Sequence, residues 1–295
     1  MAPTLLVVGA TGNIGRRVVE TLSARLGNAG SFSGHKIVAL TRSSSGVAAQ
    51  RLAQLPHVKV VEHNWVEITA DWLRQRNVVR VFIASHNEPN QFAEESTFHL
   101  AALNAGVEYV VRISTTAANV RPDCPAYYPR QHWAIEALLS SPEFERLRWT
   151  SLQPNIFSQL VLASAAELIK NFRRTGKQDT LRLISSEHAP IGSIDSNDAK
   201  YVLNGPEDIT GRQIVTMTEE YIGTKVEDVS FKDVGFVEHM AAQSSESKNV
   251  IRSIRHAPET AWEGKCMAST TSKEVLQIAP PKRTPAQVLN TLLEG

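Results

Sequence analysis

Short apolar, β-prone runs alternate with helical hydrophobic patterns along the first half of the chain. The runs that predict strands are Leu5–Val8, Lys36–Leu40, Val58–Val61, Val79–Ala84, Tyr109–Ile113 and Trp149–Leu152. The stretches that predict helices are Asn13–Leu26, Gly46–Leu55, Ala70–Gln75, Gln91–Ala105 and Arg130–Leu139. Alternation of this kind is typical of a parallel sheet covered by helices on both faces. The pattern therefore predicts an α/β fold with a doubly wound parallel sheet.

The second half of the chain has a different pattern. It predicts helices at Ile156–Asn171, Asp233–Met240 and Pro285–Leu293, and short strands at Leu181–Ile184 and Gln213–Met217. Helices and strands that do not alternate regularly indicate a smaller α+β part. We therefore expect two domains, residues 1–155 and residues 156–295, with the second forming a cap over a substrate pocket.

A glycine-rich turn joins the first predicted strand to the first predicted helix. Its glycines are spaced G-x-x-G-x-x-G rather than G-x-G-x-x-G. In this context they allow a tight turn, close backbone approach to a pyrophosphate, and close packing of helix on strand. The helix N-terminus adds N–H groups for phosphate. We expect a Rossmann-type dinucleotide site, the alternative being a glycine turn in an ordinary α/β protein. Its expected residues are Gly9, Thr11, Gly12, Asn13, Ile14 and Gly15.

Composition narrows the class of protein. The chain has 31 basic and 30 acidic residues without a basic block, which argues against direct nucleic-acid binding. Its two cysteines, Cys124 and Cys266, have no C-x-x-C spacing and predict reduced thiols rather than a disulfide or zinc site. No His or carboxylate spacing indicates another metal, and no apolar run reaches the roughly 18 residues of a membrane span. We expect a soluble, cytoplasmic protein that binds no membrane.

The residues after the second predicted strand indicate which dinucleotide binds. A carboxylate at this place bonds the free ribose hydroxyls of NAD, whereas a basic residue accommodates the 2′-phosphate of NADP. Here the strand continues into Thr41-Arg42-Ser43 without a carboxylate. We expect Arg42, with Ser43 beside it, to bind the 2′-phosphate of NADP(H). The alternative for Arg42 is a solvated loop residue, and Arg16 is a second candidate for phosphate contact.

Later strand ends supply further candidates, because ligands lie outside the carboxyl ends of parallel strands. Asn64 follows the third strand and is expected near the adenine. Ser85 follows the fourth and is expected near the inner ribose and pyrophosphate. Ser114 and Thr115 follow the fifth strand, where the nicotinamide is expected.

Four segments in order resemble the NmrA-like family of atypical and extended short-chain dehydrogenase/reductases. They are Val7 to Gly15, Leu40 to Ser43, Ile113 to Thr115, and Gln153 to Phe157. The resemblance covers roughly residues 4–240. It implies NADP(H) binding and one of two activities. Some members reduce quinones, enones, benzylic ethers or imines with NADPH, and others act as redox-sensing regulators through a partner protein.

The resemblance also suggests catalytic candidates. Short-chain dehydrogenases use Tyr-x-x-x-Lys with an upstream Ser or Thr, and Tyr128, His132 and Thr115 match this pattern with His in place of Lys. The spacing puts Tyr128 and His132 on one helix face, and either could donate a proton. Arg130 could supply the missing positive charge. The alternatives are that Tyr128 packs at a helix entry and that His132 bonds the cofactor ribose or a core carbonyl.

The segment Gln153 to Phe157 passes over the nicotinamide in the family. The resemblance therefore places Pro154 and Asn155 at the cofactor and His86, Trp133 and Phe157 in the substrate pocket. Core packing is the alternative for both aromatic residues. The chain also departs from the family between Asp198 and Tyr201, where a helix and loop are reduced to two residues. An abbreviated cap is one interpretation, and a mobile lid is the other.

Our functional prediction is an NADPH-dependent reductase acting on a small conjugated carbonyl, quinone or imine-type metabolite. One alternative is a non-catalytic NADP(H)-sensing regulator that acts through a partner protein. A redox-neutral isomerase or cyclase is another, although no residue argues for it. Fold alone does not choose among them, and a homodimer or a partner protein is compatible with each.

Overall fold

The computed structural model describes residues 2–26, 32–192 and 201–294. Two compact units divide the chain. The first unit contains Met1–Ile113 and Gln131–Ser151, and the second contains Ser114–Arg130 and Leu152–Gly295. Residues 193–200, on which the expectation about the cap rests, lie outside the described residues. The division at residue 155 stays a prediction.

A seven-stranded sheet runs through the part of the chain that the structure describes, in the order β3-β2-β1-β4-β5-β6-β9. The strands are β1 (Thr4–Val8), β2 (Lys36–Thr41), β3 (Val58–Glu62), β4 (Val78–Ile83), β5 (Tyr109–Ile113), β6 (Arg148–Pro154) and β9 (Tyr201–Leu203). The strand pairs β1–β2, β1–β4, β2–β3, β4–β5 and β6–β9 are all parallel. The predicted α/β, Rossmann-type fold is confirmed.

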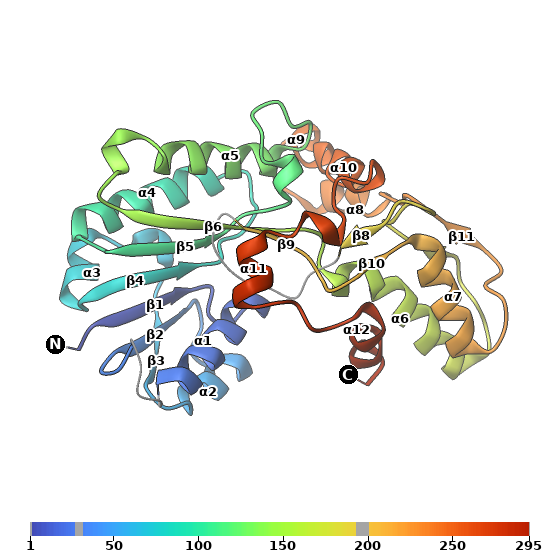
Figure 1. Ribbon diagram of the computed structural model, residues 1–295, viewed down its shortest axis with the longest axis horizontal. Coiled ribbons are helices and arrows are strands. Elements are labelled where there is room, and N and C mark those ends of the chain that lie inside the picture. The colour runs from blue at the N-terminus through green and yellow to red at the C-terminus, as the bar shows by residue number, and fades with distance from the viewer. Residues whose placement is uncertain (1, 27–31, 193–200, 295) are drawn as a thin grey trace. The chain divides into compact units, whose positions relative to one another are not determined.

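Helices follow the strands as the alternating pattern predicts. Those of the first half are α1 (Asn13–Leu26), α2 (Val47–Ala53), α3 (Ala70–Gln75), α4 (Gln91–Ala105) and α5 (Tyr127–Leu139). Helices α1 and α2 contact each other, and Figure 1 shows both on one side of the strands with α4 on the other. Helix α5 begins in the second unit and continues, from Gln131, in the first.

The core of the first unit explains why its strands are apolar without interruption. All five residues of β1 are buried, as expected of a central strand covered on both faces. Leu6, Val38, Ile83 and Val110, from β1, β2, β4 and β5, belong to one buried cluster. Phe98 of α4 belongs to the same cluster. The sheet order reverses between β1 and β4, so their carboxyl ends form the topological switch point where ligands of this fold class bind.

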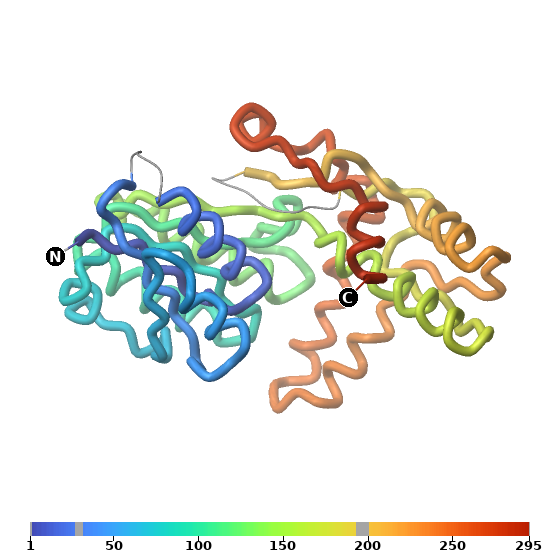
Figure 2. The backbone as a smooth tube through the Cα atoms, turned by 90° about the horizontal axis from the view of Figure 1, so that it is seen from below, coloured from blue at the N-terminus to red at the C-terminus, as the bar shows by residue number. Residues whose placement is uncertain are grey.

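The second unit combines helices with short strands. Its remaining helices are α6 (Ser158–Thr175), α7 (Gly211–Ile222), α8 (Phe236–Gln243), α9 (Lys248–Arg252), α10 (Glu259–Trp262), α11 (Lys273–Ile278) and α12 (Pro285–Glu294). Its short strands are β7 (Leu181–Arg182), β8 (Ile191–Gly192), β10 (Asp208–Ile209) and β11 (Val229–Ser230). Helix α12 packs beside α6, as Figure 2 shows.

The predicted strand at Gln213–Met217 is wrong, because these residues lie inside α7. The Thr210 side chain accepts from the backbone N–H of Gln213, and the Gln213 side chain accepts from that of Thr210. This capping box starts a helix despite the β-branched Ile214 and Val215, which are buried on one helix face. Gly223, in the left-handed conformation, ends helix α7.

Among the helices of the described residues, none is a candidate for a membrane span.

Candidate functional site

The glycine-rich turn lies at the switch point between β1 and β4. Gly9 has a φ of +76°, and a Cβ there would lie 2.5 Å from the carbonyl oxygen of Ala84. A Cβ at Gly15 would lie 2.2 Å from the carbonyl oxygen of Gly9. Gly9 therefore needs the left-handed region as well as space, and Gly15 needs close packing of α1 against the turn.

The middle of the turn is open to solvent. Gly12 and Asn13 are exposed, Thr11 and Ile14 are half-buried, and the N–H of Gly12 donates to the carbonyl oxygen of Gly9 at 3.0 Å. Helix α1 starts at Asn13, so its first N–H groups lie at this exposed end. An exposed glycine next to the free N–H groups at the N-terminus of a helix is suited to a pyrophosphate.

The loop after β2 carries the candidate phosphate ligands. Arg42 and Ser43 are exposed, and the hydroxyl of Thr41 holds the loop by donating to the Ser43 carbonyl at 3.0 Å. The Ser43 and Ser45 hydroxyls are 3.0 Å apart. Arg16, the second candidate, is half-buried in the first turns of α1. Arg42 thus has the exposure that a phosphate ligand requires.

A cavity of about 620 Å³ opens beside this loop, within the first unit. It brings together three of the predicted residues, Arg42, Asn64 and His86. His86, expected in the substrate pocket, is held here by Glu94, whose carboxylate accepts from its Nε2 at 2.6 Å. The complete lining is Arg42, Glu62, His63, Asn64, Trp65, Val66, His86 and Glu94.

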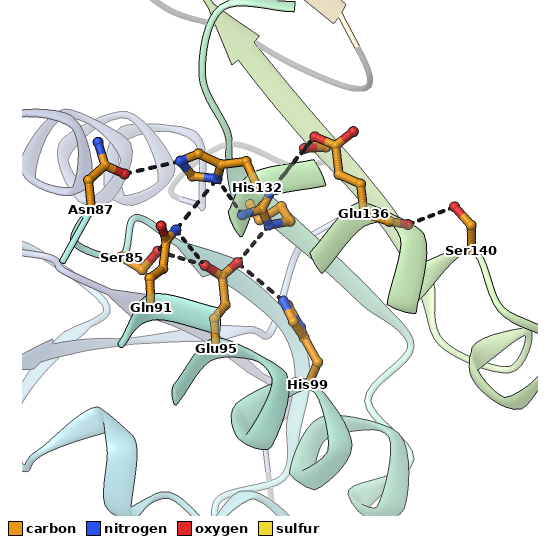
Figure 3. Close-up of polar contacts among 10 residues, drawn as sticks. Ser85, Asn87, Gln91, Glu95, His99, His132, Glu136 and Ser140 are labelled. Carbon is orange, nitrogen blue, oxygen red and sulfur yellow. Dashed lines mark hydrogen bonds and ion pairs between the residues drawn. The ribbon is translucent and has the colours of Figure 1, made fainter. Parts of the chain in front are cut away.

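A buried polar network surrounds Arg112 of β5, and Figure 3 shows Glu95, His132 and Glu136, which belong to it. The Arg112 guanidinium, with no exposed surface, donates to Glu95 at 2.6 Å and to Ser151 at 3.0 Å. Glu136 completes a second ion pair with it at 3.6 Å and accepts from the Ser151 hydroxyl at 2.6 Å. The buried guanidinium of Arg112 is thus paired with two carboxylates. Charges are tolerated in a protein interior when they are paired and hydrogen-bonded in this way.

Ser85 joins the same network from the end of β4. Its hydroxyl donates to Glu95 at 2.7 Å and accepts from the Gln91 amide at 3.1 Å. Burial raises the pKa of the Glu95 carboxyl, whereas Arg112 and His99 lower it. The net effect is a pKa well below the usual range. Ser85, predicted at the cofactor, is therefore oriented by a buried carboxylate.

His132 lies in this network and is only 1% exposed. Its Nδ1 is 2.8 Å from Nη2 of Arg112 and its Nε2 is 3.0 Å from Oδ1 of Asn87. Because a guanidinium only donates, Nδ1 accepts and the ring proton sits on Nε2, donating to Asn87. Burial and the positive charge of Arg112 lower the pKa of His132 to about 3. The imidazole is therefore neutral at neutral pH, and its role as a proton donor stays a prediction.

Tyr128 and Thr115 come together in the second unit. The Thr115 side chain hydrogen-bonds the Tyr128 phenol, and burial is the main cause that raises the pKa of Tyr128 to about 12. The phenol therefore keeps its proton at neutral pH. Arg130 lies nearby in sequence but donates to the carbonyls of Cys124, Pro125 and Ala126, so it caps a loop.

The remaining predicted residues lie at the ends of β5 and β6 and on two helices. The N–H of Ser114 donates to the Leu152 carbonyl at 2.6 Å, and both Pro154 and Asn155 are buried. The Asn155 side chain donates to Asn204. Phe157 is half-buried at the N-cap of α6, and Trp133 is 39% exposed on α5. The backbone of Ser114 is thus bonded to β6, and the side chain of Asn155 is bonded to the residue that follows β9.

Sequence reasoning missed the residues that support the site. Arg112, Glu95, Gln91 and Glu136 form the buried network, and no candidate role was given to them. One signal was available, since Arg112 interrupts the apolar run of β5 with a charge. A charge inside a central strand indicates a buried partner. The partners themselves come from α4 and α5, and no sequence spacing identifies them.

The comparisons with known proteins show the family and the fold of this chain. Residues 1–235 match the model of the NmrA-like family. A search of curated proteins finds no match. An NADPH-dependent quinone oxidoreductase from Escherichia coli, solved with NADPH, is 18% identical, with a TM-score of 0.70 over 98% of this chain and 99% of the other.

Two other solved structures that share this fold are a reductase and a transcriptional regulator. The triphenylmethane reductase of a Citrobacter species, solved with NADP(H), is 16% identical, with a TM-score of 0.66 over 98% of this chain and all of the other. NmrA, a negative transcriptional regulator, is 13% identical, with a TM-score of 0.67 over all of this chain and 96% of the other. Identities this low show a shared fold. Since the family model covers 235 of the 295 residues, the chain belongs to the NmrA-like family.

Proposed function

We propose that the protein is an NADP(H)-dependent reductase. Its substrate class is a small conjugated carbonyl, quinone or imine-type compound. The observation that carries the cofactor part of the proposal is the pairing of an open glycine turn at the switch point with an exposed Arg42 at the end of β2, and the hydrogen-bonded pair of Tyr128 and Thr115 carries the reductase part. Gly9, Gly12 and Gly15 suit the pyrophosphate, and Arg42 suits the 2′-phosphate. Family membership and two reductase-fold neighbours, solved with NADPH and NADP(H), support it.

Different residues of the chain are assigned proton donation, positioning and contact with the cofactor. NADPH, when bound, supplies a hydride to an electrophilic carbon of the substrate. We assign proton donation to Tyr128, because its hydroxyl is hydrogen-bonded by Thr115; its pKa of about 12 makes it a weak acid, so the proton is transferred only as negative charge develops on the substrate. We assign His132 a positioning role rather than proton donation, because both ring nitrogens already have partners. Its Nε2 proton is directed at Asn87, and its Nδ1 accepts from Arg112. Ser85 is held in place by Glu95 for contact with the cofactor.

A dinucleotide-sensing regulator is the second candidate. One observation favours it: the residue at the lysine position of the Tyr-x-x-x-Lys pattern is a buried, neutral His132. Burial raises the pKa of Tyr128 to about 12, which is opposite to the lowering that the lysine of this pattern provides. The fold neighbour NmrA is named as a regulator. Both candidates require NADP(H) binding, and turnover separates them.

Calorimetric titration tests whether Arg42 binds the 2′-phosphate of NADPH. Arg42→Ala should weaken NADPH binding by about tenfold or more, because a charge-assisted bidentate contact is lost. NADH binding should change less than about twofold. Arg51→Ala, which removes an exposed arginine of neighbouring α2, is the matched control for net charge. Equal losses for both dinucleotides would refute the assignment of Arg42 to the 2′-phosphate.

Turnover is then measured as NADPH oxidation, followed by absorbance, with quinones, enones and cyclic imines. A reductase should oxidise NADPH steadily, and Tyr128→Phe should lower kcat by about 100-fold or more while NADPH affinity stays within about twofold. His132→Gln should have the smaller effect on kcat. Tight NADPH binding without turnover across the panel would favour the regulator.

A further inference from the structure

Glu62, the last residue of β3, holds the loop that carries Arg42. One of its carboxylate oxygens accepts two hydrogen bonds from Ser44, from the backbone N–H at 2.8 Å and from the hydroxyl at 2.6 Å. Ser44 is two residues from Arg42, and Glu62 and Arg42 both line the cavity of the first unit. These hydrogen bonds lower the pKa of Glu62, so the group is a carboxylate at neutral pH. A fixed negative charge therefore lies in the cavity that receives the proposed 2′-phosphate.

We propose that Glu62 is a specificity-determining residue that weakens the preference for NADP(H) over NAD(H). This inference rests on the proposed function, because it concerns the same dinucleotide site. The usual carboxylate that selects NAD follows the second strand of such folds. Here that place is taken by Arg42, and the carboxylate comes from the neighbouring strand.

The hydrogen bonds of Ser44 give the first reason. A phosphate bound next to Arg42 gains from every nearby N–H and O–H that can donate to it. Both donors of Ser44 are directed at Glu62. The hydroxyls of Ser43 and Ser45 bond each other instead, and either can turn toward a phosphate. The loop thus offers the 2′-phosphate fewer donors than its run of three serines suggests.

Electrostatics gives the second reason. The 2′-phosphate carries up to about two negative charges at neutral pH, while a free ribose hydroxyl carries none. The Glu62 carboxylate repels the first and can accept a hydrogen bond from the second. Water in the open cavity screens this repulsion, so we expect it to alter the ratio of the two affinities by about three- to tenfold. Arg42 and Glu62 act in opposite directions on that ratio.

Glu62→Gln separates the charge from the loop contact. The amide oxygen of glutamine can still accept from Ser44, so the loop keeps its anchor while the negative charge is lost. Glu67→Gln is the matched control, because Glu67 is an exposed residue of the next turn and does not line the cavity. It makes the same change in net charge outside the proposed site.

The experiment is calorimetric titration of NADPH and NADH into the wild type and both variants at one fixed ionic strength. In Glu62→Gln, the NADPH dissociation constant should fall so that the ratio of NADH to NADPH dissociation constants rises about three- to tenfold. In Glu67→Gln the ratio should stay within about 1.5-fold of the wild type. An unchanged ratio in Glu62→Gln, or the same rise in Glu67→Gln, would overturn the inference.

The wild-type titration distinguishes this failure from failure of the proposed function. If the wild type binds NADPH and Glu62→Gln leaves the ratio unchanged, only the role of Glu62 is refuted. If the wild type binds neither dinucleotide, the proposed function and the inference both fail. Glu62→Ala is a second variant that also releases the Ser44 donors, and it should raise the ratio at least as far as Glu62→Gln. A lower ratio in Glu62→Ala would show that the carboxylate helps to bind NADPH by anchoring the loop.

Discussion

At the scale of single residues, the glycine turn has the least tolerance for change. A Cβ at Gly15 would lie 2.2 Å from the Gly9 carbonyl oxygen and 2.9 Å from the Cα of Ala10. Both neighbours are backbone atoms, so neither can turn away as a flexible side chain would. Relief requires that α1 move away from the turn and carry its N-terminal N–H groups with it.

Gly15→Ala should therefore lower the free energy of unfolding by about 1–3 kcal/mol, as overpacking does. It should also weaken NADPH binding by about tenfold or more, because the helix N-terminus is displaced from the phosphates. Urea unfolding and calorimetry measure the two effects. The control is Gly46→Ala, where the new Cβ meets its nearest atom at 4.0 Å and φ is −66°. Because Gly46 is the N-cap of α2 and alanine caps a helix less well than glycine, that variant should lose less than about 1 kcal/mol and should keep its NADPH affinity; equal losses of affinity in both variants would contradict the steric argument.

His132 shows how one buried group makes stability depend on pH. In the unfolded chain its pKa is about 6.5, whereas in the folded protein burial and Arg112 hold the pKa near 3. The unfolded state thus binds one more proton than the folded state between these values. Stability from this group is fully present above pH 6.5 and is lost as the pH falls toward 3.

The wild type should lose up to about 1.4 kcal/mol per pH unit from this source below pH 6.5. His132→Gln has no titrating group there, while glutamine can still accept from Arg112 and donate to Asn87. Between pH 6.5 and 4.5 the wild type should therefore lose roughly 2–3 kcal/mol more than the variant. Urea unfolding at several pH values measures this difference, and parallel pH profiles would contradict it.

At the scale of elements, α7 depends on its first turn. The Thr210 hydroxyl lies 3.2 Å from the Gln213 N–H, and Gln213 Oε1 lies 2.8 Å from the Thr210 N–H. This reciprocal cap overrides the strand propensity of the β-branched residues that follow.

Thr210→Ala should cost about 1 kcal/mol in the free energy of unfolding, because an N–H at the helix start loses its partner. Thr216→Ala makes the same substitution at an exposed position within α7 and should change stability by less than about 0.5 kcal/mol. Thermal and urea unfolding compare the two. A Thr210→Ala variant as stable as Thr216→Ala would show that packing of the helix, rather than its cap, determines α7.

At the scale of the whole molecule, ligand binding and stability are linked. A ligand at 100 times its Kd stabilises the folded state by about 2.7 kcal/mol, and at ten times its Kd by about 1.4 kcal/mol. At one NADPH concentration, chosen as 100 times the wild-type Kd, Arg42→Ala should therefore gain only about half of the wild-type stabilisation. Urea unfolding with and without NADPH tests this, and equal gains would show that Arg42 does not contribute to binding.

Much of the first unit could be predicted because its structure is encoded locally. The bounds of α1, α3, α4 and β5 agree with the hydrophobic pattern to the residue. Pattern failed at Gln213–Met217, where a cap decided between helix and strand. It also missed several short elements of the second unit, because two- to five-residue segments carry too few positions to show a period.

The sequence by itself determined the alternating architecture, the glycine turn and the absence of a carboxylate after β2, because each depends on residues adjacent in the chain. Only the tertiary structure decided the lowered pKa of His132 and the placement of Glu62 beside Ser44. His132 is neutral because it is buried and lies beside Arg112 of β5, which is twenty residues away in the sequence. Glu62 reaches Ser44 across eighteen residues. Desolvation and charge pairing depend on distance in space, and that distance follows from the packing of strands and helices.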